Sequence, residues 1–351
     1  MENEKIKGSI MEKQLTISIA AYNVENYLEK TLSSFICNSD LMEGLEVIIV
    51  NDGSRDKTCE VAKKYIEEYP NTFVLIDKPN GGYGSTINSS LKVANGRYYK
   101  LVDGDDWVDT SELEKLIDKL QYEDSDLVIT KYVKHNDLDG SEEIVNDQLK
   151  YDGVCKSTND ISLSKNFAMH QITYKTELLR NINLRITENC FYTDFEFIMK
   201  PLPYIKNVTC LDLAVYIYRL GREGQSVLLS SWFKNIDQGL RVTTNLSEYY
   251  ENVKNSISSE KMKNYMRDSI SDSVKNKYIY LTLMPKENEP KTKIKDFSKN
   301  LKRVSPEIYK NTIKIAPPVW KLAIGLLRVS GYLLFDPIRI VMRRHNREKL
   351  S

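Results

Sequence analysis

From residue 15 to residue 102 the sequence alternates short runs of β-branched and apolar residues with stretches of helical apolar periodicity. This alternation predicts an α/β domain in which strands and helices follow one another around a largely parallel sheet. The predicted strands are residues 15–20, 45–50, 72–77 and 98–102. Sheets of this kind bind ligands beyond the carboxyl ends of their strands, so the loops that follow these four strands are where functional residues are expected.

The later part of the chain has a different pattern. Further strands are expected at residues 127–133 and 211–218 and a helix at 191–199, and helical periodicity takes over after residue 230. We therefore divide the chain into four parts: a polar N-terminal extension (1–14), an α/β domain (15–228), a helical domain (229–316) and a basic amphipathic tail (317–351).

The composition excludes several classes of protein. There are 50 Lys and Arg residues against 49 Asp and Glu residues, so the net charge of +1 gives no overall attraction for nucleic acid. The five cysteines lack the CxxC spacing of a zinc site or redox pair, which indicates reduced thiols. The first 13 residues lack the apolar core of a secretory signal, and no run of apolar residues is long enough for a membrane span. We therefore expect a cytoplasmic protein.

Three carboxylates stand in four consecutive positions directly after the fourth strand, in the sequence DGDDW. Asp103, Asp105 and Asp106 repel one another unless a cation or hydrogen-bond donors lie among them. Hard oxygen ligands of this kind suit Mg²⁺ or Mn²⁺ shared with a diphosphate. The alternative is a solvated acidic turn, but the position after a buried strand favours a metal site.

Two other loops at the same edge have features of a nucleotide site. Asp52 ends the second strand in NDGSRDKT, where its carboxylate can accept hydrogen bonds from a base or ribose. The alternative is that Ser54 or Asp56 only caps the next helix. The loop PNGGYG, with Asn80 and Gly81, allows backbone N–H groups to approach an anion closely. The glycine motifs of dinucleotide-binding and Walker A sites are absent.

Four segments resemble the family-two glycosyltransferases of the GT-A fold, in that family's order and spacing. They are SIAAYNVENYLEKTLSSF, EVIIVNDGSRDKT, NGGYGSTIN with the following ANGRY, and KLVDGDDW. The match is strong over residues 15–109, weaker to residue 226 and absent from the helical tail. The resemblance implies a Rossmann-like, mostly parallel GT-A domain that binds a nucleotide-sugar.

The resemblance also implies roles for individual residues. Asp103 and Asp105 would hold Mn²⁺ or Mg²⁺ against the donor diphosphate, and Asp106 belongs to the same motif. Asp52 would hydrogen-bond the base, which in the family is usually uracil. The nucleotide-binding residues implied in this way are Ala21, Tyr22, Asp52, Asn80, Gly81 and Asp103.

Inverting transfer needs a base that takes the proton of the acceptor hydroxyl as it attacks the anomeric carbon. The family uses the Asp of a Glu-Asp pair, and the best match here is YTDFEF. Asp194 fits the base, whereas Thr193 replaces the usual Glu. Glu196 is an alternative base, and Asp194 acting only as a helix cap is an alternative without catalysis.

Five further residues are candidates at the diphosphate or acceptor. His170 is expected near one of these groups, although a lone histidine is more often structural. The segment YRLGREGQS resembles a family loop that closes over the diphosphate, in which Arg219 or Arg222 would pair with phosphate and Ser226 would donate a hydrogen bond. A solvated surface turn is the alternative. Trp107 would form part of the sugar or acceptor floor, or belong to the core.

The tail combines an apolar segment with a cluster of cations. Residues 319–351 carry seven Lys and Arg residues against two acidic residues, a net charge of +5. This pattern suits a helix lying in an anionic membrane surface, with Pro337 interrupting it. The alternative is that the apolar face packs on the helical domain or on a second subunit of a homo-oligomer.

Together these features predict an inverting, metal-dependent glycosyltransferase in the cytoplasm, at the inner face of the plasma membrane if the tail binds lipid. The donor would be a UDP-sugar and the acceptor a hydroxyl of a cell-envelope glycan or a lipid-linked acceptor. A nucleotidyltransferase is disfavoured because the glycine- and Arg/Lys-rich loop is absent after the first strand. A non-catalytic nucleotide- or glycan-binding subunit is a further alternative because Thr193 replaces the Glu.

Overall fold

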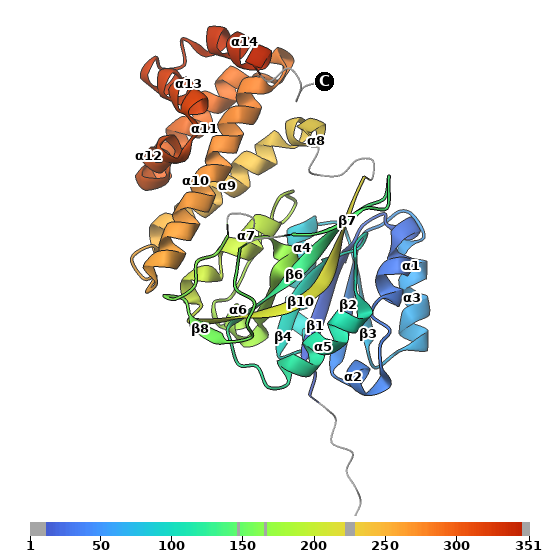
Figure 1. Ribbon diagram of the computed structural model, residues 1–351. Helices are drawn as coiled ribbons and strands as arrows, with labels where there is room; N and C mark the ends of the chain where they lie inside the picture. Colours follow the sequence, from blue (N-terminus) through green and yellow to red (C-terminus); the bar gives the residue numbers. More distant parts are fainter. Residues whose placement is uncertain (1–11, 146–147, 165–166, 222–228, 346–351) are drawn as a thin grey trace, which may run out of the picture.

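In the computed structural model, which describes residues 12–145, 148–164, 167–221 and 229–345, an α/β part is followed by a helical part (Figure 1). A ten-stranded sheet forms the centre of the α/β part. In spatial order its strands are β3 (Phe73–Lys78), β2 (Leu45–Asp52), β1 (Leu15–Ala21), β4 (Tyr98–Asp103), β9 (Ile172–Lys175), β6 (Leu127–Asn136), β10 (Asn207–Leu220) and β5 (Trp107–Val108), with β7 (Glu142–Ile144) beside β6 and β8 (Cys155–Ser157) beside β10.

The four strands predicted from the alternation form the parallel part of the sheet. β1 lies between β2 and β4, with Leu15 opposite both Leu45 and Tyr98. Every residue of β2 is buried, as expected for a parallel strand covered on both faces. Beyond β4 the sheet is mixed, because β9 runs antiparallel to both β4 and β6. β9 has only four residues, too few to produce a periodic pattern in the sequence.

The helices described in the α/β part are α1 (Glu25–Ser33), α2 (Ser39–Glu43), α3 (Thr58–Glu68), α4 (Tyr83–Val93), α5 (Thr110–Leu120), α6 (Thr176–Asn181) and α7 (Asp194–Met199). Figure 1 shows α1 and α3 together along one side of the sheet. The start of α5 follows directly from its sequence, because the Asp109 side chain accepts a hydrogen bond from the Glu112 N–H at 3.0 Å. The predicted helix at 191–199 begins only at Asp194, because Tyr192 has a φ of 65°, outside the helical region.

The helical part contains α8 (Leu229–Lys234), α9 (Ile236–Val253), α10 (Glu260–Leu283), α11 (Pro290–Val304), α12 (Pro306–Ile315), α13 (Pro318–Val329) and α14 (Phe335–His345). The 24-residue α10 is its central element and contacts α9, α11, α12 and α14. Ile270, Val274, Tyr278 and Leu281 recur along one face of α10 and are completely buried. Within the described residues, no helix combines the length and apolar character needed to cross a bilayer.

The tail does not break at the expected residue. α13 ends at Val329, and Pro337 lies in the first turn of α14. Proline is tolerated in a first helical turn, because the N–H that it lacks has no partner within the helix there. The break precedes this proline, at Gly331 with a φ of 58° and Tyr332 with a φ of 70°.

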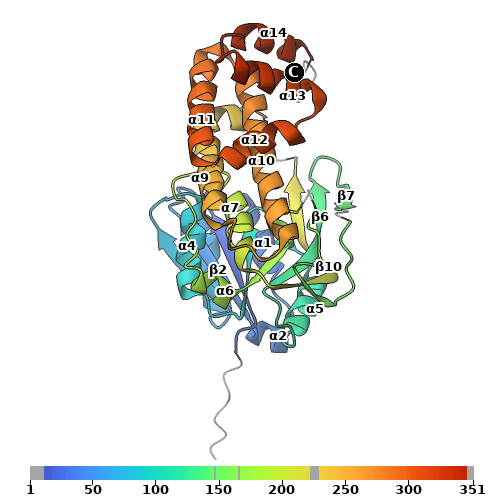
Figure 2. The ribbon, with the colours of Figure 1, turned by 90° about the vertical axis from the view of Figure 1, so that its left-hand side faces the viewer.

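Hydrogen bonds fix the helical part to the α/β part. The Tyr249 hydroxyl donates to the Lys200 carbonyl at 2.7 Å, directly after α7. The Phe191 N–H, just before α7, donates to the Gln238 side chain at 2.8 Å. Figures 1 and 2 show the helical part at the end of the sheet opposite to the start of β1. The helical part therefore stands where the parallel strands end.

Gly84 in α4 and Gly325 in α13 offer a matched test of how closely α4 packs on the segment around Thr187. A Cβ atom at Gly84 would lie 2.1 Å from the Thr187 carbonyl oxygen, whereas Gly325 in α13 has nothing within 4 Å of a Cβ. Gly84→Ala is expected to lower the free energy of unfolding by about 1–3 kcal/mol through overpacking. Gly325→Ala should raise it by up to about 1 kcal/mol, because alanine favours the helix. Urea unfolding measures both, and equal effects would contradict the packing described for α4.

Candidate active site

The glycine-rich loop after β3 wraps around the carboxylate of Asp52. This carboxylate is buried and accepts hydrogen bonds from the N–H groups of Gly81 at 2.9 Å and Gly82 at 2.8 Å. The Lys78 ammonium pairs with it, and the Asn80 amide donates to the Asp52 carbonyl at 2.8 Å. The predicted nucleotide-binding residues Asp52, Asn80 and Gly81 are thus brought together. They form one hydrogen-bonded unit at the carboxyl edge of the sheet.

The loops after β1 and β2 are also joined to each other. Ala21 is buried at the end of β1, and the next residue, Tyr22, has 48% of its surface exposed. Asn23 accepts a hydrogen bond from the Arg55 N–H at 2.9 Å, and its own N–H donates to the Ser54 hydroxyl at 3.0 Å. These bonds hold the exposed Tyr22 ring at the same edge as Asp52, where it is available to a planar ligand.

The acidic loop begins where β4 ends and passes close beneath β1. A Cβ atom at Gly104 would lie 2.8 Å from the Ala20 carbonyl oxygen, so this approach requires glycine. The Asp103 carboxylate accepts a hydrogen bond from the Tyr83 hydroxyl at 2.7 Å. Asp103 therefore ends the strand with its carboxylate held from the first turn of α4.

Asp106 differs from the other two carboxylates because only 1% of its surface is exposed. Its oxygens accept hydrogen bonds from the Tyr216 hydroxyl and from the Arg219 N–H, both on β10. Burial, together with the charges of Asp103 and Asp105, raises the pKa of Asp106 well above its usual range. Asp106 thus anchors the acidic loop to β10.

The residues available for a metal ion are Asp103 and Asp105. No group of three or more His, Cys, Asp or Glu side chains capable of holding a metal occurs in the part of the chain that the structure describes. Mg²⁺ is commonly held by one or two carboxylates together with substrate phosphates. The crowded negative charge that raises the pKa of Asp106 is what a divalent cation would offset. The pair therefore fits a cation shared with a diphosphate.

Arg219 and Trp107 lie beneath the acidic loop. The Arg219 side chain donates to the Asp105 carbonyl and to the Asp137 carboxylate, both at 2.7 Å. Its guanidinium lies 4.8 Å from the Trp107 ring centroid, and the Lys30 ammonium lies 3.3 Å from the same centroid. Both Arg219 and Trp107 are buried, so the structure places them where they support the loop. Arg222 and Ser226 lie outside the described residues.

His170 is half-buried in a cluster of rings beside the acidic loop. Its ring stacks on Tyr218 with centroids 4.6 Å apart and lies 4.4 Å from the Tyr216 ring centroid. Burial lowers the pKa of His170 to about 3, with the nearby Lys100 charge contributing. The imidazole is therefore neutral, and its ring packs against the tyrosines as part of the wall of the site.

Lys100 is a residue of this region that the sequence analysis did not single out. It lies in β4, is completely buried, and its ammonium donates to the carbonyls of His170 at 2.7 Å and Ile172 at 3.3 Å. Burial lowers its pKa to about 7. A lysine in the apolar run YYKLV was the available signal, because a charged side chain inside a buried strand must find internal partners.

Asp194 is the first residue of α7, and burial raises the pKa of its carboxyl group. After burial, the charges of both Asp103 and Asp194 raise the pKa of the Tyr83 hydroxyl. Besides burial, the carboxylates of the acidic loop and Asp194 also raise the pKa of Tyr218. The charges of the candidate metal ligands and of the candidate base thus both act on these two tyrosines.

Glu196, the alternative base, is completely buried and fully hydrogen-bonded. Its oxygens accept from the Thr187 N–H at 2.7 Å, the Thr187 hydroxyl at 2.8 Å and the Lys200 ammonium at 3.0 Å. Thr193, which replaces the usual Glu, is buried as well. Glu196 thus ties α7 to the preceding segment, whereas Asp194 lines a cavity.

The fold of this chain resembles that of a solved protein. The structure superposes on S. aureus TarS 1-349, solved in complex with UDP-GlcNAc, with a TM-score of 0.70 and 18% sequence identity. The alignment covers 95% of this chain and 92% of that chain. It confirms the GT-A fold expected from the sequence, with a helical part after it. The same TarS segment without ligand gives a TM-score of 0.69.

The chain belongs to glycosyl transferase family 2. The family model described as "Glycosyl transferase family 2" matches residues 16–191, half of the chain. Glycosyltransferase GlyA of Streptococcus pneumoniae is 31% identical over 131 residues, which are 37% of this chain and 18% of that protein. The minor teichoic acid biosynthesis protein GgaB of Bacillus subtilis is 28% identical over 233 residues, 63% of this chain and 25% of that protein. The chain therefore spans a quarter or less of the length of these two relatives.

Lys100→Met is expected to change how stability depends on pH. In the folded chain the pKa of Lys100 is about 7, against 10.5 for a free lysine side chain. Between these values the unfolded chain holds a proton that the folded chain has released, so Lys100 makes stability rise with pH. The free energy of unfolding of the wild type should therefore increase relative to that of Lys100→Met from pH 7 toward pH 10.5.

Urea unfolding across this pH range measures the difference between the two proteins. Lys119→Met, at an exposed position of α5, is the reference for removing a lysine charge. A difference between wild type and Lys100→Met that stays constant with pH would contradict the burial of this ammonium.

Proposed function

We propose that the chain is an inverting, metal-dependent glycosyltransferase that moves a sugar from a UDP-sugar to a hydroxyl of a cell-envelope glycan. One observation carries the proposal: the Asn189 N–H, five residues before Asp194, donates to the Gly81 carbonyl at 2.6 Å, and the Tyr83 hydroxyl donates to Asp103 at 2.7 Å, so the glycine loop joins the segment of the candidate base to the acidic loop. A base on one side and a diphosphate-metal site on the other is the arrangement that inverting transfer needs. The acceptor oxygen then attacks from the side opposite to the departing diphosphate.

The donor would lie along the edge formed by the loops after β1, β2 and β3. Tyr22 would contact the base, and the unit built from Asp52, Asn80 and Gly81 would hold the nucleoside. Asp103 and Asp105 would hold Mn²⁺ or Mg²⁺, which would offset the charge of the departing diphosphate. Asp106, bonded to β10, keeps this loop in place during the reaction.

Asp194 would take the proton of the acceptor hydroxyl. A carboxyl group whose pKa is raised by burial is a stronger base than an exposed one, so the raised pKa of Asp194 suits this role. Glu196 is the weaker candidate because three hydrogen bonds already occupy its oxygens. Because Thr193 stands where the family has the Glu of the Glu-Asp pair, Asp194 is the one carboxylate of that pair in the proposed mechanism.

Relatives support the choice of donor and acceptor class. The TarS structure holds UDP-GlcNAc, and GgaB is named for minor teichoic acid biosynthesis. A UDP-sugar donor and a hydroxyl-bearing envelope glycan, free or lipid-linked, are the corresponding substrates proposed for this chain. We place the enzyme in the cytoplasm at the inner face of the plasma membrane, as the sequence analysis predicts.

Nucleotide release from a panel of UDP-, GDP- and dTDP-sugars tests the function. We expect release from a UDP-sugar, lost with EDTA and restored by Mn²⁺ or Mg²⁺. Asp194→Asn should lower turnover by about 10²–10⁴-fold, because general base catalysis is removed. Asp40→Asn, at an exposed position of α2, is the control for a lost surface carboxylate.

Two outcomes would contradict this function. Undiminished turnover in the Asp103→Ala/Asp105→Ala double variant would exclude the metal assignment. Donor binding detected by calorimetry without any nucleotide release, even with membrane extracts as acceptor, would favour a non-catalytic binding subunit.

We further propose that α13 and α14 contact an anionic membrane surface. One face of α13 is buried, so this face packs on the rest of the helical part; its residues are Trp320, Ala323, Ile324 and Leu327. The other face exposes Val319, Leu322, Leu326 and Val329, and the next turn exposes Leu333. Lipid is the proposed occupant of this exposed apolar stripe.

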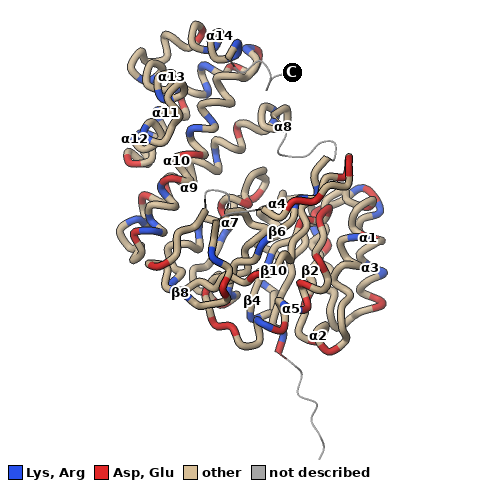
Figure 3. Tube along the Cα trace, in the orientation of Figure 1, with Lys and Arg blue, Asp and Glu red and all other residues tan. Residues whose placement is uncertain are grey.

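Only some of the tail's cations are available for lipid. Arg328 donates to the Tyr309 carbonyl at 2.6 Å, and Arg339 and Arg343 donate to carbonyls at the end of α10. Lys321 and Arg344 are exposed. Figure 3 shows the Lys and Arg positions along α13 and α14. The apolar stripe would thus supply most of the affinity, and the exposed cations the preference for anionic lipid.

Val329→Ser/Leu333→Ser tests the membrane contact. These side chains are 89% and 79% exposed, so their replacement should leave the fold intact. We expect wild type to sediment with phosphatidylglycerol-containing vesicles and the double variant to bind them roughly tenfold more weakly, because two apolar side chains are lost. Ile144→Ser/Val154→Ser, exposed on the α/β part, is the control. Failure of wild type to bind, or a dimer abolished by the same substitutions, would contradict the proposal.

A further inference from the structure

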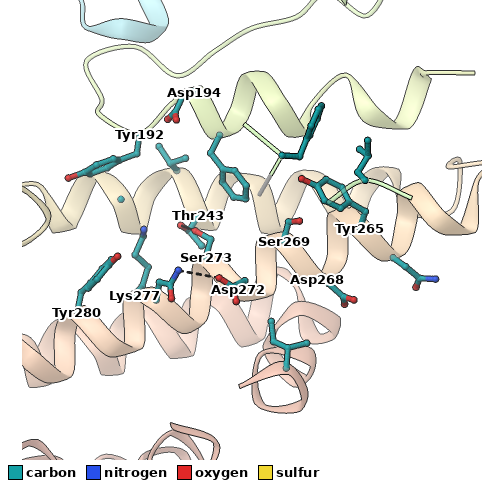
Figure 4. Close-up of a pocket in the computed structure, with 18 of the residues that line it drawn as sticks. Tyr192, Asp194, Thr243, Tyr265, Asp268, Ser269, Asp272, Ser273, Lys277 and Tyr280 are labelled. Atoms are coloured by element: carbon teal, nitrogen blue, oxygen red, sulfur yellow. Dashed lines mark hydrogen bonds between the residues drawn. The ribbon is translucent and has the colours of Figure 1, made fainter. Parts of the chain in front are cut away.

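A cavity of about 740 Å³ lies between the α/β part and the helical part, next to Asp194 (Figure 4). Its lower wall in Figure 4 is α10, and its other walls come from α9 and from the segment around α7. The α10 residues that line it recur every three or four positions, so they form one face of the helix: Asp268, Ser269, Asp272, Ser273, Asn276 and Lys277. Tyr265 and Tyr280 line the cavity from the same helix, and Phe195 and Val242 add apolar side chains from the other walls.

The polar face of α10 is half-buried, and the side chains of Asp268 and Asp272 are 46% and 51% exposed. Ile270, Val274 and Tyr278 fill the core on the other side of the helix. Some polar groups in the cavity bond to one another, as the Thr243 and Ser273 hydroxyls do at 3.0 Å. Hydroxyl, amide and carboxylate groups gathered along this partly open cavity favour a ligand rich in hydrogen-bonding groups.

Lys277 gives this cavity a specific binding group. Only 3% of its surface is exposed, and its ammonium lies 3.9 Å from the Trp232 ring centroid. Within the described residues it makes no hydrogen bond or ion pair, although the Asp194 charge acts on it. Figure 4 shows the ammonium pointing from α10 toward Tyr192 and Asp194. A buried ammonium without a hydrogen-bond partner is suited to an oxygen of a ligand.

The segment that carries Asp194 is held against this lysine under backbone strain. Tyr192 has a φ of 65°, which is unusual for a bulky residue. Its ring stacks on Trp232 with centroids 3.6 Å apart and planes 5° apart. The stack joins the segment before α7 to α8, and Lys277 covers the same rings. Strained residues of this kind cluster at functional sites.

The charges in the cavity limit what it can bind. Three carboxylates line it, Asp194, Asp268 and Asp272, against two ammonium groups, Lys261 and Lys277. Arg267 and Lys275 pair with Asp268 and Asp272, so these two cations are already engaged. The described lining thus offers no row of cations to a polymer with a phosphate in each repeat, and an uncharged ligand needs none.

We propose that this cavity binds the acceptor and that the acceptor unit is an uncharged, polyhydroxylated sugar. The proposal rests on the glycosyltransferase function proposed above. The reacting hydroxyl lies at Asp194, Lys277 holds a neighbouring oxygen, and the polar face of α10 bonds the remaining hydroxyls. Asp194 takes the hydroxyl proton, the acceptor oxygen bonds to the anomeric carbon, and the bond from that carbon to the nucleoside diphosphate breaks.

Ser273→Phe tests the assignment by filling the cavity from α10, and Lys277→Met tests it with little change of volume. The probes are p-nitrophenyl hexosides and N-acetylhexosaminides as uncharged acceptors, and glycerol phosphate and ribitol phosphate oligomers as charged ones. UDP release above the rate without acceptor is the readout. We expect uncharged glycosides to stimulate release, and the ratio of acceptor KM to donor KM to rise at least tenfold in each variant.

Ser258→Phe, at an exposed position between α9 and α10, is the matched control and should keep the wild-type ratio. An unchanged ratio in both cavity variants would overturn the site. Stimulation by the phosphate oligomers alone, or by neither set while UDP is still released to water, would overturn the acceptor class. Absence of any UDP release from wild type would instead refute the glycosyltransferase function on which the proposal rests.

Discussion

The burial of Asp106 beside two other carboxylates is the interaction on which the rest of the site depends. A carboxyl group in that position needs donors on every side, and β10 supplies them through the Tyr216 hydroxyl and the Arg219 N–H. Arg219 then reaches back to the Asp105 carbonyl and packs on Trp107. The acidic loop after β4 is therefore shaped by a strand that lies more than a hundred residues later in the chain. The conformation of this loop therefore depends on contacts with β10.

The parallel half of the fold could be predicted because its signals are local. Each of the strands β1 to β4 begins within one residue of its expected start, and the alternation of strands and helices placed the acidic loop, Asp52 and the glycine loop at one edge of the sheet. Apolar periodicity and turn residues involve only a few neighbouring positions, so they can be recognised in a single sequence. For the same reason Asp194 could be found only by resemblance, because nothing in its own neighbourhood marks a buried carboxylate.

The remaining features depend on contacts between distant segments. The four-residue β9 is a strand only because β4 and β6 are available on its two sides. Lys277 looks like an ordinary charged residue in the sequence, and the apolar run around Lys100 shows that it is buried but not what it contacts; the partners of both come from other elements. Tyr83, Tyr216 and Tyr218 likewise gain their importance from the carboxylates that the fold brings to them. The members of such pairs are separated by no regular interval in the sequence, so the sequence alone does not reveal them.

The division of α10 into two faces has a consequence for how such enzymes diversify. Ile270, Val274 and Tyr278 hold the helical part together, while Ser269, Ser273 and Asn276 face the cavity. Because the two sets lie on opposite sides of one helix, residues of the second set can change without removing any contact of the first. A gene duplicate could thus acquire a new ligand preference through a few substitutions on a helix whose stability is set elsewhere. Ligand specificity could then diverge through substitutions on one face of α10, while the other face keeps the fold unchanged.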